Sequence, residues 1–585
     1  MSVEGLDRAA VRTPLLVPSL RGYRTAYAGR DVVAGLVLSA LLVPQGMAYA
    51  ELAGLPPVTG LYTSILCLVG YALVGPSRIL VLGPDSSLGP MIAATILPLV
   101  AADGDPARAV LLASALAIIT GIVMVAAGLG HLGFVADLLS KPTILGYMNG
   151  LALTIIVGQL PKLLGFSVDA ETFVQEVRGV IAGIVSGDIL WPAAGIGLLS
   201  LALMLVLNRW LPKVPSVLVA VVVAMAISIW LDLAARGVKT IGVLPEGLPS
   251  FTVPRVGVAD LGVLLVGGLS IALVALADTI STATSFAARQ GERVDGDREM
   301  IGIGTANIAA GLFQGFPVST SGSRTAVAEQ AGSRSQVSGL VGAFMIAVML
   351  VFVPGLLSAL PQPTLGAIVV VAAMSLADIP GTVRLYHQRK ADFYLSMAAF
   401  LGVAFLGVLP GIVLAIALSV VNVFRRIWMP YRTELGRPAG VRGLHDVRMY
   451  PEAEHLPGCV ILRFDAPLIF ANAGTFRTTV LESLEREPRP SWVIIAAEPI
   501  TDVDTTACDM LDDLVPELEE AGVHLVFSEL KDGVRAKLRD YGLDTALGDD
   551  RFFPTTHAAV DAFQEVDGTH WEPRPPGWAR GHKEQ

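Results

Sequence analysis

Cysteine, charged and aromatic residues are all scarce in this 585-residue sequence. The three cysteines, Cys67, Cys459 and Cys508, are too few and too scattered for a disulfide framework or a zinc site, so we expect buried free thiols. Only 16% of residues are charged and 6% are aromatic, whereas 53% are hydrophobic. With a mean hydropathy of +0.64 and many segments near the roughly 20 residues needed to cross a bilayer, the chain is too apolar for a soluble protein. The composition predicts a polytopic α-helical membrane protein.

The few charges are unevenly placed. Residues 431–585 hold 28 of the 51 acidic and 16 of the 41 basic side chains, a net charge of −12 that leaves +2 for the rest. This predicts a separate soluble, acidic domain at the C-terminus, and the overall charge of −10 gives no indication of nucleic-acid binding. The apolar segments contain no histidine, cysteine and carboxylate cluster with catalytic or metal-ligand spacing. We therefore expect no enzyme, no structural metal and no cofactor.

Hydrophobic runs predict fourteen membrane spans in two sets of seven, separated by a polar loop at 235–257. The predicted spans are 31–50, 57–75, 84–101, 109–130, 142–164, 190–211, 215–234, 258–288, 299–314, 318–331, 336–358, 364–379, 391–408 and 409–428. Lys and Arg collect in alternate loops, and this places both termini on the cytoplasmic side of the cell's inner membrane. Because each repeat has an odd number of spans, the second copy is inverted, as in many secondary transporters.

The third and tenth spans are predicted to be broken. Residues 78–84 (RILVLGP) and 314–317 (QGFP) each end in a proline, which suits the first turn of a helix. We expect half-helices to start at Asp85 and after Pro317, with their N-termini facing one another in the membrane. Such ends offer unpaired N–H groups and partial positive charge, which favour an anion. The stretch 311–324 (GLFQGFPVSTSGSR) adds hydroxyl groups and an arginine, and polar groups in lipid need protein or a water-filled cavity around them.

Motifs in the first two spans carry a resemblance to a known family. Residues 43–50 (VPQGMAYA), 52–57 (LAGLPP) and 60–64 (GLYTS) closely resemble the sulfate permease (SulP) family of anion transporters. The resemblance extends over nearly the whole chain, from about Arg21 to Phe563. It implies a transporter at 29–430 after a cytoplasmic segment at 1–28. It also implies a core domain of spans 1–4 and 8–11 that moves like an elevator against a gate domain of spans 5–7 and 12–14.

The residues of the expected anion site come from three spans. Neutral hydroxyl and amide donors can bind an oxyanion without the desolvation cost of a buried lysine. The expected substrate-binding residues are Gln45, Tyr49, Asp85, Ser86, Ser87, Ser321, Gly322, Ser323 and Arg324. Arg324 has a structural alternative, as a partner of Glu329 or of backbone carbonyls.

Asp278 and Thr282 are expected to hold the coupling ion. They stand four residues apart and so share one face of the eighth span. A carboxylate and a hydroxyl there could ligate Na⁺, or the carboxylate alone could carry a proton. Protonated Asp85 could donate a hydrogen bond to an anion, and this inclines the interpretation toward H⁺ symport.

The C-terminal part, 440–563, resembles a STAS domain, a small α/β module. Strands are expected at 460–465, 492–496 and 524–527, alternating with helices at 474–485 and 507–521. In signalling relatives a serine in an Asp-Ser-Ser-Gly loop is phosphorylated, and Thr505 takes that position here. Residues 566–585 are expected to form a flexible tail.

The expected function is secondary active transport of a small anion: sulfate, bicarbonate or a dicarboxylate. Two alternatives stay open: an uncoupled anion channel or exchanger, and a membrane signalling receptor whose output is the STAS domain. The expected partners are the anion, the lipid bilayer, a second copy in a homodimer, and a cytoplasmic protein bound through the STAS domain. No nucleic acid is expected.

Overall fold

The protein forms two compact units, Met1–Val420 and Val421–Gln585. The structure is a computed structural model, and it describes residues 23–100, 105–132, 140–170, 172–211, 214–290, 294–438, 441–543, 547–568 and 571. Several basic residues used for the predicted orientation, Arg21, Lys213, Arg289 and Arg293 among them, have side chains outside this described part. Most of the predicted tail, 566–585, lies outside it as well.

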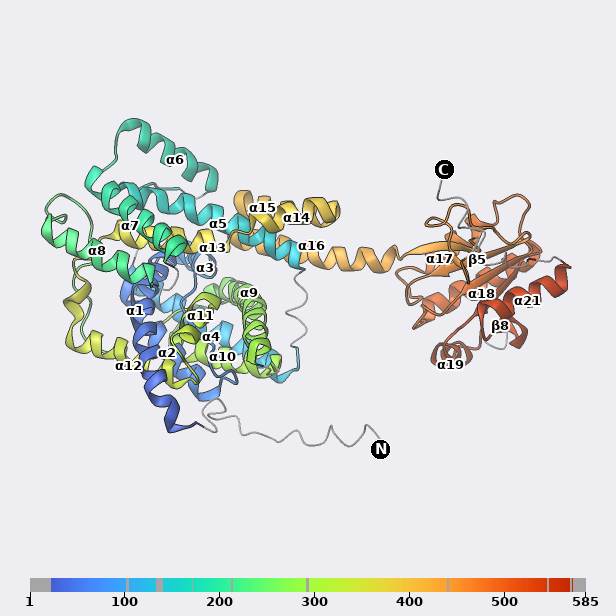
Figure 1. Ribbon diagram of the computed structural model, residues 1–585, viewed down its shortest axis with the longest axis horizontal. Coiled ribbons are helices and arrows are strands. Elements are labelled where there is room, and N and C mark those ends of the chain that lie inside the picture. Colours follow the sequence, from blue (N-terminus) through green and yellow to red (C-terminus); the bar gives the residue numbers. More distant parts are fainter. Residues whose placement is uncertain are drawn as a thin grey trace. The chain divides into compact units, whose positions relative to one another are not determined.

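The first unit is helical, and its longest helices follow the apolar runs (Figure 1). The first set is α1 (Ala28–Leu52), α2 (Pro57–Val74), α3 (Gly89–Val100), α4 (Pro106–Leu129), α5 (Lys141–Leu164), α7 (Trp191–Trp210) and α8 (Ser216–Trp230). The second set is α9 (Val258–Gln290), α10 (Gly296–Leu312), α11 (Gly322–Gln330), α12 (Val337–Phe352), α13 (Gln362–Leu376), α15 (Lys390–Leu406) and α16 (Val408–Trp428). Each of these helices overlaps one predicted span. Within the described residues, eight helical stretches are long and apolar enough to cross a membrane.

Two further helices lie between the predicted spans. Helix α6 (Phe173–Ser186) begins at a capping box, in which Thr172 and Gln175 bond each other's backbone N–H groups. Helix α14 (Ile379–Gln388) begins where the Asp378 side chain accepts a hydrogen bond from the Gly381 N–H at 2.7 Å.

The helices of the first unit pack in two groups. In the first group α10 packs on α4 and α2, α1 packs on α2 and α12, and α9 packs on α4 and α3. In the second group α13 and α15 pack on α5, and α7 packs on α8 and α13. Glycines permit very close backbone approach inside the first group, since a Cβ added to Gly60 would lie 1.9 Å from the Gly46 carbonyl oxygen. The two groups meet where α1 contacts α13 and α8.

Two short, buried strands pair within the first unit. Strand β1 (Leu82–Gly83) precedes α3 and pairs antiparallel with β2 (Ser319–Thr320), which precedes α11. Helices α3 and α11 rise only about 18 and 14 Å, too short to span a hydrocarbon core of about 30 Å. The expected start of each half-helix, at or just after its proline, is wrong. Backbone groups near the two prolines are satisfied outside a helix. Arg324 donates to the Pro84 carbonyl, and the Phe316 and Val318 N–H groups donate to Thr63 and Asn307, while β1 pairs with β2. Helices α3 and α11 therefore begin only at Gly89 and Gly322.

The second unit is an α/β domain with a six-stranded sheet. The strands are β3 (Arg432–Gly436), β4 (His445–Asp446), β5 (Cys459–Phe464), β6 (Trp492–Ala496), β7 (His524–Ser528) and β8 (Phe552–Phe553), in the order β4-β3-β5-β6-β7-β8. Strands β5 to β8 run parallel, and β3 is antiparallel to β4 and β5. The sheet therefore includes a strand that precedes residue 440, where the domain was expected to start.

Helices cover both faces of this sheet. Helices α17 (Ala473–Ser483), α18 (Thr505–Glu520) and α19 (Asp532–Asp540) contribute to one apolar core, and α21 (Thr556–Asp567) to the other. The alternation along β5 divides its side chains between the two cores, with Val460 on one face and Ile461 on the other. All three cysteines are buried free thiols, which confirms the expectation.

Candidate functional site

Asp85 organises the N-terminal end of α3. Its Oδ1 accepts hydrogen bonds from the Ser87 N–H at 2.9 Å and the Ser87 hydroxyl at 2.6 Å. The carbonyl of Asp85 then accepts a helical hydrogen bond from Gly89. The turn 86–88 thus separates Asp85 from the helix, which starts four residues later than predicted. The hydroxyl of Ser87 is already engaged, and Ser86 is buried beside it.

Ser321 caps α11 in the same manner. Its hydroxyl accepts a hydrogen bond from the Arg324 N–H at 3.4 Å and lies 3.1 Å from the Ser323 hydroxyl. Gly322 leaves open space above the helix end, because a Cβ added there would contact only Thr282, at 3.9 Å. There is therefore space for a ligand beside the first turn of α11, where the N–H groups other than that of Arg324 have no acceptor within the helix.

A cavity of about 470 Å³ brings the two helix ends together with α1. Of the nine predicted substrate-binding residues, eight line it: Gln45, Tyr49, Asp85, Ser86, Ser87, Ser321, Gly322 and Ser323. Gln45 and Tyr49 reach it from α1, which carries Pro44 within the helix. The cavity thus collects hydroxyl, amide and phenol donors around two helix N-termini, an arrangement that suits a small oxyanion.

Arg324 lies behind this cavity instead of lining it. Its side chain is 1% exposed, donates to the Pro84 carbonyl, and places Nη2 3.7 Å from Asp85 Oδ2. Gly83 makes room for the guanidinium, since a Cβ there would lie 3.1 Å from Nη1. This position does not favour the expected direct contact with substrate, which stays a prediction. Arg324 ties α11 to the entry of α3, with Asp85 as its partner in place of Glu329.

Asp278 lines the cavity from α9, and Thr282 stands close to it on the same helix. Asp278 Oδ2 accepts a hydrogen bond from the Ser319 hydroxyl at 3.2 Å, so α9 is joined to β2. Beside it, the Thr320 hydroxyl lies 3.1 Å from that of Thr279. Thr282 is not among the lining residues, but its hydroxyl lies near Gly322. Among the described residues, no group of three or more histidine, cysteine or acidic side chains could hold a metal ion.

The second helix group supplies lining residues that the sequence did not indicate. Ser216 at the start of α8 donates a 2.6 Å hydrogen bond to Asn208 near the end of α7, and both line the cavity with Ser375 of α13. The one feature of the sequence that could have indicated these residues is the polar Asn208 near the end of an apolar run. The cavity is thus walled by both helix groups.

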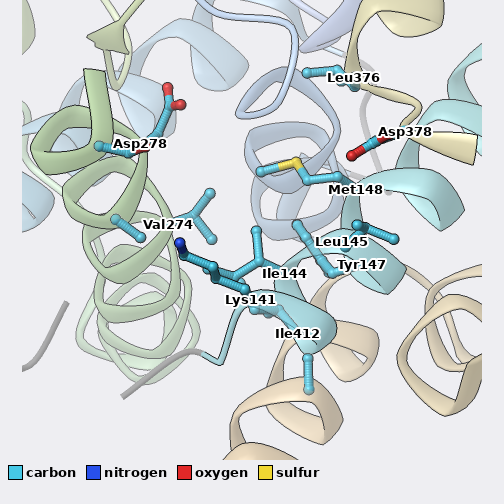
Figure 2. A pocket seen from close by; sticks show the side chains of 13 residues that line it. Lys141, Ile144, Leu145, Tyr147, Met148, Val274, Asp278, Leu376, Asp378 and Ile412 are labelled. Carbon is cyan, nitrogen blue, oxygen red and sulfur yellow. The ribbon is translucent and has the colours of Figure 1, made fainter. Parts of the chain in front are cut away.

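A second cavity, of about 350 Å³, adjoins the first (Figure 2). Both cavities are lined by Asp278, Met148 and Leu376. The second one extends along α5, α9 and α16, and its other charged residues are Lys141 and Asp378.

Thr505 is the exposed first residue of α18 in the second unit. The preceding Asp504 accepts hydrogen bonds from the Ala507 N–H at 2.8 Å and the Phe470 N–H at 2.7 Å, which fixes the loop. Phosphorylation of Thr505 stays a prediction.

Known proteins resemble both units. The sequence profile of the sulfate permease family matches residues 29–399, and that of the STAS domain matches 450–559. A probable sulfate transporter of Mycobacterium tuberculosis is 40% identical over 549 residues, covering 94% of this chain and 97% of the relative. Probable sulfate transporter 3.3 of Arabidopsis thaliana is 30% identical, covering 85% and 82%.

Solved structures share the fold. The structure of SLC26A9 matches with a TM-score of 0.85 at 24% identity, covering 95% of this chain and 94% of that one. The transmembrane domain of the cyanobacterial bicarbonate transporter BicA matches with a TM-score of 0.59 at 22% identity, covering 67% and 98%. From the family match and the identity to its relatives, this chain belongs to the sulfate permease family and carries a C-terminal STAS domain.

Proposed function

We propose that this protein is a secondary active transporter of a small oxyanion, with sulfate as its first candidate substrate. The observation that carries the proposal is the cavity where the N-termini of α3 and α11 meet, which is lined by hydroxyl and amide donors and by the two carboxylates Asp85 and Asp278. Serine hydroxyls, Gln45 and backbone N–H groups can replace the water around an anion. The buried Arg324 adds positive charge behind the site without contacting the ligand.

Sulfate is favoured by the names of the relatives. Two sequence relatives are described as probable sulfate transporters, and one of them is 40% identical over nearly the whole chain. The name of BicA supports bicarbonate as an alternative, and dicarboxylates also fit the donor set. Sulfate is tetrahedral and doubly charged, and it presents four acceptor oxygens to donors that approach from several helices.

We further propose an elevator movement. The anion cavity lies against both helix groups, because α1, α9, α11 and the turn before α3 line it on one side, and α7, α8 and α13 of the second group line it on the other. Displacement of the first group along the second would carry the cavity from one membrane face to the other. In this proposal the first group is the core and the second is the gate.

Asp278 is the proposed coupling residue. It is a carboxylate in the wall of the anion cavity, and it accepts its hydrogen bond from a neutral hydroxyl at 3.2 Å. A carboxylate inside a membrane protein is costly when it is ionised and unpaired, and a carried proton or Na⁺ compensates that cost. We favour H⁺ symport, with Na⁺ bound at Asp278 and Thr282 as the alternative.

Location and partners complete the proposal. We place the protein in the inner membrane with both termini in the cytoplasm, as a homodimer that meets a cytoplasmic partner through its STAS domain. A channel or exchanger would move anions without an imposed gradient of H⁺ or Na⁺. A receptor would lose none of its activity when transport is abolished.

Uptake into proteoliposomes tests this function. Labelled sulfate should accumulate above its equilibrium level when the outside of the proteoliposomes is more acidic than the inside. Bicarbonate or a dicarboxylate should compete with sulfate if it binds at the same site. Accumulation that requires a Na⁺ gradient would show that Na⁺, and not H⁺, is the coupling ion. Flux that only equilibrates would indicate a channel or exchanger and contradict coupling.

The combined variant Ser321→Leu and Ser323→Leu tests the site. Two branched side chains would fill the space in front of α11, so we expect uptake to fall at least about tenfold, the equivalent of roughly 1.4 kcal/mol in binding. The control is Ser285→Leu, because Ser285 is an exposed serine of α9 outside the cavity that bonds its own helix. Normal uptake by the double variant would remove α11 from the mechanism.

A further inference from the structure

We propose that Lys141 selects anions in the cytoplasmic half of the translocation path, at a place distinct from the anion site. This inference rests on the proposed transport function. The second cavity, beside Asp278, is the space through which the anion passes between its site and the cytoplasm, and Lys141 is the residue that draws it there.

The two cavities share part of their lining. Asp278, Met148 and Leu376 line both, so an anion leaving the helix N-termini passes these three side chains to enter the second cavity. The second cavity is bounded by α9 of the first helix group, by α5 of the second, and by α16, whose Ser419 accepts a hydrogen bond from the Ser140 N–H at the start of α5. It therefore lies along the interface at which the two helix groups would move in the proposed elevator movement.

Lys141 provides the one cation among the described lining residues of the second cavity. Figure 2 shows its side chain reaching from α5 toward α9, the helix that carries Asp278. Besides Asp278, the other charged residue there is Asp378. One of its carboxylate oxygens accepts a hydrogen bond from the Gly381 N–H and so caps the start of α14. Lys141 is exposed, and its ammonium group forms no ion pair or hydrogen bond with the described part of the chain.

Stabilisation of the start of α5 does not explain a lysine at this position. Lys141 is the first residue of α5, where the helix dipole disfavours a cation. The start of α5 is stabilised by other contacts, since the Ser140 N–H donates to Ser419 and the Ser140 and Thr143 hydroxyls lie 2.6 Å apart. Replacing the lysine should therefore leave the helix intact.

An electrostatic role makes two quantitative predictions. The attraction between Lys141 and an anion is proportional to the anion's charge, so the logarithm of the fold-change should be about twice as large for sulfate as for bicarbonate. The effect should also shrink at high ionic strength, because exposed charges are screened. An effect of shape alone would show neither dependence.

The test compares the two membrane faces. In everted membrane vesicles, which present the cytoplasmic face to the medium, Lys141→Met should raise the half-saturating sulfate concentration roughly threefold to tenfold, as loss of a steering charge does. In right-side-out vesicles the value should not change. Lys390→Met is the matched control, because Lys390 is likewise an exposed lysine and the first residue of its helix, α15, and it lines neither cavity.

Chemical restoration of the charge separates electrostatics from folding. The three native cysteines are buried, so Lys141→Cys offers an accessible thiol. Modification with aminoethyl methanethiosulfonate should restore the cytoplasmic affinity, and the similarly sized sulfonatoethyl reagent should lower it further. Equal changes at both faces, or no change at either, would overturn the role of Lys141 while wild-type transport stands. Absence of transport by the wild-type protein would remove the proposed function and this inference with it.

Discussion

Asp278 is the residue on which the coupling proposal depends. It lines both cavities, and through Ser319 it contacts β2, the strand that leads into α11. A proton or Na⁺ bound at this carboxylate would remove a negative charge from the wall of the anion cavity. Binding of cation and anion would then favour each other.

Asp278→Asn should uncouple transport. The substitution keeps the shape and removes the ionisable group, so accumulation against a gradient should vanish while exchange or facilitated flux survives. Uptake is measured under separately imposed pH and Na⁺ gradients. Asp260→Asn, on the same helix but in an ion pair with Arg108 at 3.8 Å, is the control and should accumulate normally. Accumulation by the Asp278→Asn protein would make Asp278 structural and Asp85 the next coupling residue to test.

Most of the individual site residues were predictable from the sequence, but their side-chain directions and distant neighbours were not. Residue type and spacing identified the polar positions before α3 and α11, and eight of the nine predicted substrate-binding residues share one cavity. The direction of the Arg324 side chain was not predictable, because it depends on the space left by Gly83 and on the Asp85 carboxylate far away in sequence. Asn208 and Ser216 were missed for the same reason, since α7 and α8 meet the site only through tertiary packing.

At the scale of elements, long apolar helices were predictable and irregular segments were not. Apolar length predicted α1, α4, α9 and their neighbours directly. The pairing of β1 with β2 was not visible, because each strand has only two residues and its partner lies in the other repeat. Proline alone therefore misplaced the helix starts. Helix α6 did have a local signal, the capping box at Thr172 and Gln175.

An ion pair joins α1 of the first helix group to α5 of the second. Lys162 Nζ lies 3.4 Å from Glu51 Oε2, and the two side chains are 36% and 10% exposed. Glu51 stands in the last turn of α1, where the helix dipole disfavours a carboxylate, so Lys162 compensates a local cost. The pair lies at the opposite end of α5 from Lys141, across the boundary where the two groups would move.

Breaking this pair should destabilise the observed arrangement of the two groups. Glu51→Gln and Lys162→Met should each lower the melting temperature in detergent by about 1–4 °C, and the double variant should lose less than the sum of the two. Lys162 is partly exposed, so the coupling energy should be only about 0.5–2 kcal/mol. Arg389→Met, which removes a pair within α15 and its cap, is the control. Strict additivity would show that the pair contributes nothing to stability.

At the scale of the whole molecule, the two units have separate apolar cores. The core of the first unit contains only residues before Val420, and the cores of the α/β domain begin at Leu435. The shift in charge composition near residue 431 predicted this division from the sequence. All the described residues that line the anion cavity belong to the first unit.

Removal of the STAS domain should therefore spare the anion site. A chain ending at Pro430 keeps α16 whole and ends before β3, so it should bind sulfate with an affinity within about threefold of the full chain, a difference of roughly 0.65 kcal/mol. Turnover or yield is expected to fall, because the truncated protein loses the proposed contact of the domain with a cytoplasmic partner. Binding is measured by calorimetry on detergent-purified protein. Loss of binding by a monodisperse, cooperatively melting truncated protein would contradict the independence of the site.

The position of the bound anion is the most direct test of the account. Selenate has the shape and charge of sulfate, and its selenium scatters anomalously, so a crystal of the protein grown with selenate would locate the ligand without ambiguity. We predict one anomalous peak in the cavity between the N-termini of α3 and α11, within hydrogen-bonding distance of Ser321 and of the backbone N–H groups of α11. A well-occupied peak elsewhere, with this cavity empty, would contradict the proposed anion site.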